Sequence, residues 1–268
     1  MPDPFANVDA ASPEMIEIIA NALETRAADP SMLPVIDAYL DALDVPDGGC
    51  IVDIGSGTGG VTRRIASRFH RAKVLGVEPS AALTRKASEL AESLQNLSFS
   101  QGHGAALSIE DASADVAILH TVLSHVTVPT KIVVEAARIL RPGGTMVICD
   151  ADFSKASMGV VPGDPLGSCV EAFVSGAVTD PWLTGKLKPI VVDAGLRVMQ
   201  FSVLNRVVTE GLGSLVWVRM SASRLVSEGV IGQPLADALE AEYMRRAEAG
   251  TLYSFLPFVT LIASKPTV

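Results

Sequence analysis

The chain has 268 residues, 49% of them hydrophobic, and a formal net charge of −9. This length fits one α/β domain with insertions, and no apolar run reaches the roughly 18 to 20 residues that cross a bilayer. The acidic balance argues against a nucleic-acid partner, because such proteins neutralise phosphates with a basic surface.

The cysteines and the first residues indicate the compartment. Cys50, Cys149 and Cys169 show no metal-ligand spacing, so we expect no metal site and a reducing environment. The stretch 1–4 is acidic and lacks the features of a signal peptide. We therefore expect a cytoplasmic protein with no transmembrane segment.

Two helices are predicted before the first strand. Ser12-Pro13-Glu14 is a helix-start pattern, and a second helix is expected from Met32 to Leu43. Residues 1–45 would form a lid at one edge of a ligand cleft. Arg26, between the helices, either reaches a ligand carboxylate or is an ordinary solvated surface arginine.

A buried strand from Cys50 stops in a glycine-rich turn, and a helix over Val61 to Phe69 follows. Strand, glycine turn and helix N-terminus together predict a nucleotide-cofactor site. Gly55, Gly57 and Gly60 fit the dinucleotide spacing G-x-G-x-x-G. The same turn, read from Asp53 to Gly59, fits the D-x-G-x-G-x-G pattern of S-adenosylmethionine methyltransferases, so the turn alone leaves both cofactors open.

Strands and helices then alternate, which predicts βαβ units and a parallel, doubly wound sheet. The expected strands are 73–77, 97–101, 116–120, 145–150 and 197–207, and the expected helices are 81–94, 129–140 and 183–194. Ligands bind at the carboxyl ends of such strands, so functional residues should lie there.

The last part of the chain breaks the alternation. Residues 211–250 read as helical, and an antiparallel strand is expected over 258–263. The glycine- and proline-rich stretch 151–181 predicts a substrate-facing loop with a short helix near Val170 to Val174. The expected fold is one α/β domain, 1–268, with a Rossmann-like, seven-stranded, mostly parallel sheet and helices on both faces. Its parts would be the lid, a cofactor core at 46–208, a helical substrate cap at 209–250 and the last strand at 251–268.

Glu78 ends the second predicted strand and is followed by Pro79 and Ser80. A carboxylate at this place can accept two hydrogen bonds from a ribose diol. The alternative is a surface glutamate that only caps a turn.

Several motifs in one order now carry a resemblance. They are the turn from Asp53 to Gly59, the strand-end acid Glu78, the apolar strand closed by His120, and Arg141-Pro142-Gly143-Gly144 before the fifth strand. Over roughly Leu33 to Gly195 the chain resembles class I S-adenosylmethionine-dependent methyltransferases of the type 11, ubiquinone-menaquinone methyltransferase-like group. The resemblance implies S-adenosylmethionine as cofactor and S-adenosylhomocysteine as product.

The resemblance also implies roles by position. The turn would hold the methionine and ribose parts, Asp53 would orient the turn or meet the ammonium, and Glu78 would bind the ribose hydroxyls. Pro79 and Ser80 would flank the adenine, and His120 would line the cofactor. The implied turn residues are Gly55, Ser56, Gly57 and Gly59.

One motif departs from the family pattern. Many relatives carry Gly-Asp-Ala after the third strand, whereas this chain has Gly102-His103-Gly104. A neutral His103 could accept a hydrogen bond from the adenine amine through its unprotonated nitrogen. The alternative is an ordinary loop histidine.

His125, beyond the fourth strand, could face the acceptor, and Asp152, after the fifth strand, lies near the same rim. Methyl transfer needs mainly alignment, but a hydroxyl acceptor needs a general base. His125 is the first candidate and Asp152 the second. A buried structural histidine is the alternative at both His120 and His125.

The expected acceptor is a small, rather apolar metabolite, such as a polyketide, phenol or quinone, with oxygen as the favoured acceptor atom. Apolar residues in the predicted lids support this, although they could equally be core packing. The chain lacks the Asn/Asp-Pro-Pro-Tyr/Phe motif after the fourth strand, so adenine or glutamine amino groups are not expected substrates. Two alternatives stay open: a cofactor-binding protein with other or no chemistry, such as a pericyclic enzyme or a ligand sensor, and an NAD(P)-dependent oxidoreductase. The oligomeric state stays open as well.

Overall fold

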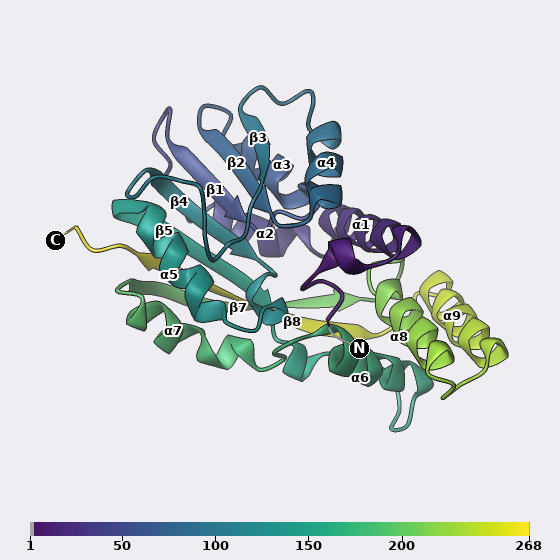
Figure 1. Ribbon diagram of the computed structural model, residues 1–268. Helices are drawn as coiled ribbons and strands as arrows, with labels where there is room; N and C mark the ends of the chain where they lie inside the picture. The colour runs from purple at the N-terminus through teal and green to yellow at the C-terminus, as the bar shows by residue number, and fades with distance from the viewer. Residues whose placement is uncertain (1–2, 268) are drawn as a thin grey trace.

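A single mixed sheet forms the centre of the computed structural model, which describes residues 3–267 (Figure 1). Its strand order is β3-β2-β1-β4-β5-β8-β6, and β7 pairs with β8. The strands are β1 (Cys50–Ile54), β2 (Lys73–Glu78), β3 (Leu97–Gln101), β4 (Ala114–His120), β5 (Leu140–Ala151), β6 (Ser157–Met158), β7 (Arg197–Val208) and β8 (Ser254–Ser264).

The five strands from β3 to β5 pair in parallel, while β8 runs antiparallel to β5, β6 and β7. This confirms the predicted doubly wound, mostly parallel sheet with an antiparallel last strand. The two-residue β6 is an eighth strand that the sequence pattern did not indicate.

Helices cover both faces of the sheet. On one face lie α2 (Leu33–Leu40) and α3 (Gly60–Arg68), and on the other lie α5 (Pro129–Ile139) and α7 (Leu187–Asp193), each with its own apolar core (Figure 1). The helix α4 (Ala81–Leu90) follows β2 and packs on β3.

The remaining helices gather near the carboxyl ends of the parallel strands (Figure 1). They are α1 (Pro13–Ala28), α6 (Pro165–Ala177), α8 (Leu215–Ser227) and α9 (Gln233–Glu248). Ser12 caps α1 as predicted, because its Oγ accepts a hydrogen bond from the Met15 amide at 3.3 Å. The predicted helices of the 211–250 segment are present as α8 and α9. The division of the chain into lid, core, cap and last strand remains a prediction.

The stretch predicted as a loop with a short helix near Val170 contains the 13-residue α6 instead. Asp164 caps it by accepting a hydrogen bond from the Leu166 amide at 3.1 Å, and Pro165 occupies its first turn. Cys169 and Phe173 lie on its buried face. The sequence contains this helix-start pattern at Asp164 and Pro165, but the glycines and prolines around it led to the prediction of a loop.

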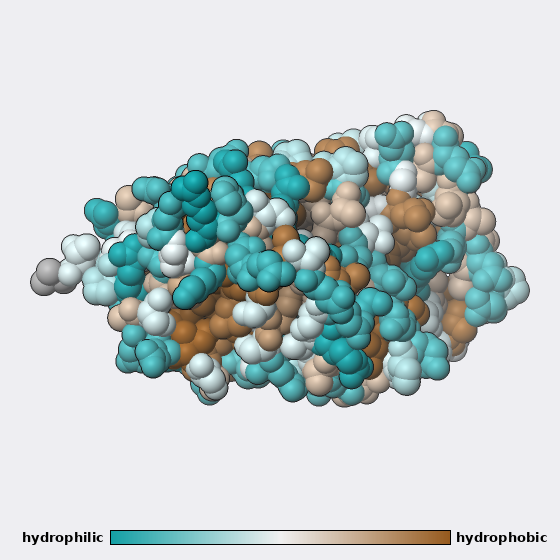
Figure 2. Space-filling model, turned by 90° about the horizontal axis from the view of Figure 1, so that it is seen from above, coloured by the Kyte–Doolittle hydropathy of each residue, from teal (hydrophilic) through white to brown (hydrophobic). Residues whose placement is uncertain are grey.

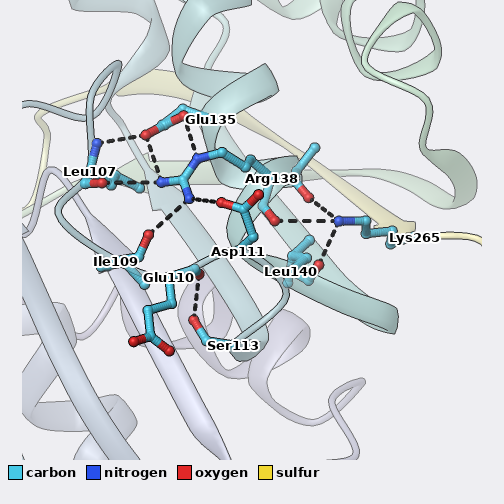
Figure 3. Close-up of polar contacts among 10 residues, drawn as sticks. Leu107, Ile109, Glu110, Asp111, Ser113, Glu135, Arg138, Leu140 and Lys265 are labelled. Atoms are coloured by element: carbon cyan, nitrogen blue, oxygen red, sulfur yellow. Dashed lines mark hydrogen bonds and ion pairs between the residues drawn. The ribbon is translucent and has the colours of Figure 1, made fainter.

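A dense polar network joins the β3–β4 loop to α5 (Figure 3). Arg138 donates to Glu135 Oε1 at 2.8 Å, to the Ile109 carbonyl at 2.9 Å and to Asp111, and Glu135 accepts from the Leu107 amide at 2.7 Å. Lys265 donates to carbonyls at the C-terminal end of α5, including Ala137 at 2.8 Å. These partners fix the loop, and none of them lines the two cavities described below.

Arg141 to Gly144, which the prediction placed before the fifth strand, belong to β5, which begins at Leu140. The register shifts between Ala114 and Val116 to accommodate them, and Arg141 Nε lies 2.5 Å from Asp115 Oδ1. The motif therefore has a structural role at the amino end of the sheet, away from the ligand end.

Apolar surface is scattered over the molecule. Seen from above, it lies in separate patches among hydrophilic residues (Figure 2). The strand β7, which pairs on one side only within the described residues, carries exposed side chains such as Met199 and Val203. In the described part of the chain, no helix has the length and apolar character that crossing a membrane requires.

Candidate active site at the carboxyl ends of the strands

The glycine turn follows β1 directly and is fixed by β2. The Val77 carbonyl accepts hydrogen bonds from the amides of Gly55 at 2.7 Å and Ser56 at 3.1 Å. Gly55 has φ +78°, and a Cβ there would lie 2.6 Å from Val122 Cγ2. Only glycine fits at this position, because both the backbone conformation and the space exclude a side chain.

Asp53 is the buried acid beneath this turn. Thr62 Oγ1, on α3, donates to its Oδ2 at 2.6 Å, so Asp53 ties the strand to the helix on either side of the turn. Burial raises the pKa of Asp53 to about 6, although the Thr62 hydrogen bond opposes the shift, and the negative charge of Glu78 adds to it. The role of Asp53 towards the cofactor remains a prediction.

Glu78 ends β2 and faces the turn. Its Oε2 accepts from the Gly57 amide and its Oε1 from the Ser80 amide, both at 3.0 Å. The residue is 6% exposed, and burial raises the pKa of its carboxyl. Two oxygens held by backbone donors in this way keep further lone pairs for ligand hydroxyls. Pro79 lines the adjoining cavity.

His103 lines the same cavity, but its hydrogen bond changes the role expected for it. Its Nδ1 accepts from the Ala105 amide at 3.1 Å. In the neutral ring the proton must therefore be on Nε2, which can only donate. His103 is thus suited to an acceptor nitrogen of a base, not to the adenine amine that we expected it to face.

Two adjoining cavities meet at the turn, and they share walls made by Leu23, Arg26, Gly55, Gly57 and Thr121. The smaller one, the turn cavity, is also lined by Asp53, Ser56 and His120. The larger one, the main cavity, reaches Glu78, Pro79, His103 and Gly104 in one direction and His125 in the other.

Polar atoms without partners surround the turn. Among the described residues, the buried side-chain atoms that lack a hydrogen bond are Glu24 Oε1, Ser56 Oγ, Thr58 Oγ1 and His120 Nε2. Burying an unpaired polar group costs about 1–3 kcal/mol. Their clustering here indicates that this part of the fold is built to receive a polar ligand.

His120 is held by the hydroxyl of Tyr39, 3.2 Å from its Nδ1. Burial, together with the charge of Arg26, lowers the pKa of His120 to about 3, so the ring is neutral at physiological pH. It lines the turn cavity, as expected, and it cannot serve as a cation.

Arg26 lies between the two cavities and donates to Thr121 Oγ1 at 2.8 Å. This is the one hydrogen bond that its side chain makes within the described residues, and burial and the nearby Arg206 lower its pKa to about 10. Thr121, at the end of β4, has φ +54°, which is a strained conformation for a β-branched residue. Arg26 is therefore placed at the walls of both cavities, and its contact with a ligand carboxylate remains a prediction.

Aromatic side chains form the far end of the main cavity, beyond the turn. They come from five separate segments of the chain: Phe5, Phe153, Phe173, Trp217 and Phe258. Arg206, 3% exposed, also lines this end and is paired with Asp29 at 2.7 Å. The cavity is therefore apolar where it is farthest from Glu78, with a few polar groups at its walls.

His125 belongs to the 3₁₀ turn η2 (Leu123–His125) and lines the main cavity. Its Nδ1 lies 2.9 Å from Asp3 Oδ2. Asp152 differs, because its Oδ1 accepts from Ser154 Oγ at 2.5 Å and, among the described residues, it is absent from the cavity walls. The strand β5 ends at Ala151, so Asp152 lies beyond it and does not continue the alternation of side chains along the strand.

Of the predicted cofactor residues, nine line one of the two cavities: Asp53, Gly55, Ser56, Gly57, Glu78, Pro79, His103, Gly104 and His120. Gly59, Ser80 and Gly102 act behind the walls. Gly59 caps α3, Ser80 caps α4 by accepting from the Leu83 amide at 3.2 Å, and the Gly102 amide donates to the Glu78 carbonyl at 3.0 Å.

Sequence reasoning missed Asp3, Phe5 and Arg206. A charged residue inside the apolar run from Val203 to Val208 was a signal for Arg206. Nothing in the sequence pattern indicates that Asp3 reaches a histidine 122 positions later.

Comparisons with known proteins agree with this geometry. Residues 52–148 match the family model described as a methyltransferase domain. The dimethylglycine N-methyltransferase of Parasynechococcus marenigrum is 33% identical over 119 residues, which are 43% of this chain and 42% of that protein. The chain thus spans less than half the length of this curated relative.

Two solved structures share the fold at low identity. The [4+2]-cyclase SpnF has a TM-score of 0.62 and 19% identity, with 100% of this chain and 99% of that chain covered. The Haemonchus contortus phosphoethanolamine N-methyltransferase 2, solved with phosphomonomethylethanolamine and S-adenosylhomocysteine, has a TM-score of 0.61 and 18% identity, with 98% and 60% covered.

The resemblance noted in the sequence is thereby confirmed by a family model that covers the turn and the strands β1 to β5 up to Ile148. Residues 52–148 therefore form a methyltransferase domain of the class I, S-adenosylmethionine-dependent type.

Proposed function

We propose that this protein transfers a methyl group from S-adenosylmethionine to a small, largely apolar acceptor, with oxygen as the acceptor atom. The observation that carries this proposal is one cavity that joins the Glu78 carboxylate and the glycine turn to an aromatic end containing His125. A polar cofactor end and an apolar acceptor end in one enclosure are what methyl transfer requires.

The residues at the polar end fit the parts of the cofactor. Glu78 would accept from the ribose hydroxyls, and Nε2–H of His103 would donate to a nitrogen of the adenine ring. Arg26 would hold the methionine carboxylate, because it has no carboxylate partner within the described protein residues. Asp53 would hold the turn in place against the ligand.

When bound, the cofactor supplies an activated methyl group. The chain contributes alignment, which in the best intramolecular models is worth roughly 7–11 kcal/mol. The aromatic walls would orient a flat apolar acceptor and exclude water, and Nε2 of His125 would hold the proton that an acceptor hydroxyl loses. Asp152, the second base candidate, is not supported by its position outside the cavity walls.

The test has two steps. Mass spectrometry of the denatured, purified protein is expected to detect co-purified S-adenosylmethionine or S-adenosylhomocysteine, whereas NAD or NADP would contradict the proposal. The full chain is then incubated with S-adenosylmethionine and a panel of phenols, catechols and hydroxyquinones, and the release of S-adenosylhomocysteine is measured. Products methylated at oxygen are expected, and methylation at carbon or nitrogen would overturn the assignment of the acceptor atom.

A second candidate function has one specific observation in its favour. The structure titled as a [4+2]-cyclase matches the whole length of this chain, so the fold also accommodates chemistry other than methyl transfer. If this alternative is right, S-adenosylmethionine would bind to the protein, but no S-adenosylhomocysteine would form with any acceptor of the panel. Cofactor binding with turnover would exclude this alternative.

A further inference from the structure

We infer that Asp3 is a positioning residue for His125, and that the N-terminal strap, defined as residues 3–10, completes the proposed base by lying across the main cavity. This inference rests on the proposed methyl transfer with His125 as base. It adds an assignment of tautomer and a second residue, from a segment 122 positions away in sequence.

The contacts of Asp3 define the proton on His125. Oδ2 lies 2.9 Å from His125 Nδ1, and it also accepts from the Thr179 amide at 3.0 Å and the Thr179 hydroxyl at 2.9 Å. Oδ1 accepts from the Phe5 amide at 2.9 Å. The carboxylate is thus surrounded by donors, so it acts as an acceptor only. Nδ1 of His125 must therefore carry the proton, and Nε2 of the neutral ring is free to accept one.

The surroundings fix the direction of the ring. The side chains of His125 and Asp3 are 10% and 5% exposed. Phe5 packs on the imidazole with ring centroids 4.9 Å apart, and Phe153 meets its edge at 5.8 Å. The other charged group near the ring is Asp150, whose oxygens are taken by the amide and hydroxyl of Ser124 and the Ala151 amide.

Nε2 of His125 makes no hydrogen bond within the described residues, and His125 lines the main cavity. A ring clamped on both sides, with its proton on Nδ1 and its bare nitrogen unengaged, has the arrangement of an oriented general base. Without Asp3, the imidazole of His125 could change both its tautomer and its orientation.

The other end of the strap is anchored beside Glu78. Asp9 accepts from the Ala81 amide at 2.8 Å and from Ser80 Oγ at 2.5 Å, and the Ser80 amide in turn donates to Glu78. Between the anchors, Phe5 and Val8 line the main cavity. In Figure 1 this segment runs from the start of α1 towards α6. One short segment therefore links the polar end of the cavity to the histidine at the apolar end.

The first test reads the tautomer and needs no acceptor. The full chain, labelled with ¹⁵N at its four histidines, is saturated with S-adenosylhomocysteine, and long-range ¹H–¹⁵N spectra are recorded. The spectrum of His125→Gln identifies the signals of His125. We expect the Nδ1–H form in the unmodified chain and a mixture of tautomers in Asp3→Ala.

Thr179→Val is the matched control, because it removes another partner of Asp3 and leaves the contact with His125. It should retain the Nδ1–H form. An Nε2–H form in the unmodified chain, or an unchanged tautomer in Asp3→Ala, would overturn the inference.

The second test is a double-mutant cycle on turnover, with a phenol from the panel as acceptor. We expect Asp3→Asn to lower kcat about 10- to 100-fold, the range typical of residues that orient a functional imidazole. The KM for S-adenosylmethionine should change little. In a His125→Gln background, Asp3→Asn should add no further loss, because it acts through His125.

The outcomes separate the two claims. If His125→Gln leaves kcat unchanged, the proposed base is wrong whatever Asp3 does. If His125→Gln lowers kcat and Asp3→Asn does not, or if the two losses are additive, the positioning role of Asp3 is wrong while the proposed base stands. Thermal unfolding of Asp3→Asn and Asp3→Ala verifies that each variant is folded at the assay temperature.

Discussion

The polar network around Arg138 and the polar groups around the glycine turn show opposite patterns of hydrogen bonding. Arg138, Glu135 and Lys265 each find several partners, and none of them borders a cavity described above. Around the turn, Ser56 Oγ and His120 Nε2 are buried without partners. Both regions are rich in charge, so charge alone does not mark the site. Unused hydrogen-bonding capacity beside a cavity does.

The largest expected effect comes from Glu78. Replacing it with Ala or Gln should weaken S-adenosylmethionine binding about 100-fold, since charge-assisted hydrogen bonds contribute roughly 1.5–3 kcal/mol each and 1.4 kcal/mol is a factor of ten. Glu135→Ala, in the Arg138 network, is the control and should leave the affinity unchanged. Calorimetric titration measures both, and equal losses in the two variants would erase the distinction between the regions.

Arg138→Met tests the other side of the comparison. It removes the hydrogen bonds that hold the β3–β4 loop, so the free energy of unfolding should fall by about 2 kcal/mol. The affinity for S-adenosylmethionine should not change. Denaturant unfolding gives the first quantity and calorimetry the second. A variant that keeps its stability and loses cofactor binding would show that this network serves the site.

Arg26→Met should weaken cofactor binding about tenfold, because the methionine carboxylate of the cofactor would lose the hydrogen bond and the positive charge of Arg26. The free energy of unfolding should stay the same or rise, since a half-buried arginine without a carboxylate partner is removed. Arg206→Met is the matched control. It breaks the ion pair with Asp29, so it should lower stability. A marked loss of stability in Arg26→Met would assign Arg26 to the fold.

The smallest expected effect is a pH dependence set by Asp53. Burial holds the pKa of Asp53 at about 6, above the 3.8 of an ordinary aspartate, so the folded protein binds more protons than the unfolded chain between these values. The contribution of Asp53 to stability therefore falls as pH rises from about 4 to 6. The positive charge of bound S-adenosylmethionine favours the ionised form of Asp53, so the affinity for S-adenosylmethionine should rise several-fold from about pH 5 to 7.

Asp53→Asn should flatten this dependence of affinity on pH. The check is a series of calorimetric titrations across the range with both proteins. An affinity that is equally steep in Asp53→Asn would mean that another group titrates.

The fold was predictable where a local pattern decided it. Alternating periods of two and 3.6 residues predicted β1 to β5 and their helices. The antiparallel last strand was predicted as well, but β8 begins at Ser254 rather than at Phe258, so Pro257 lies inside the strand. The helix predicted near Val170 to Val174 is present in α6 but was predicted too short, because glycines and prolines near Asp164 suggested a loop while the cap at Asp164 starts the helix. Burial of residues such as Phe173 decides between helix and loop here, and the sequence alone does not show which residues are buried.

The site was predictable in part for the same reason. Asp53 and Glu78 lie at strand ends, and parallel strands bring their carboxyl ends together. The partners of His103 and His125 were not predictable. His103 accepts from the amide of Ala105, so its other nitrogen is a donor and not the acceptor that we expected. His125 meets Asp3, whose position depends on the path of the strap.

The central claim, that the turn and Glu78 hold S-adenosylmethionine, is tested most directly by calorimetric titration of the unmodified chain with S-adenosylmethionine and, separately, with NADH. We expect one saturable site per chain for S-adenosylmethionine, competition by S-adenosylhomocysteine, and no heat of binding with NADH. Binding of NADH without binding of S-adenosylmethionine would contradict the account.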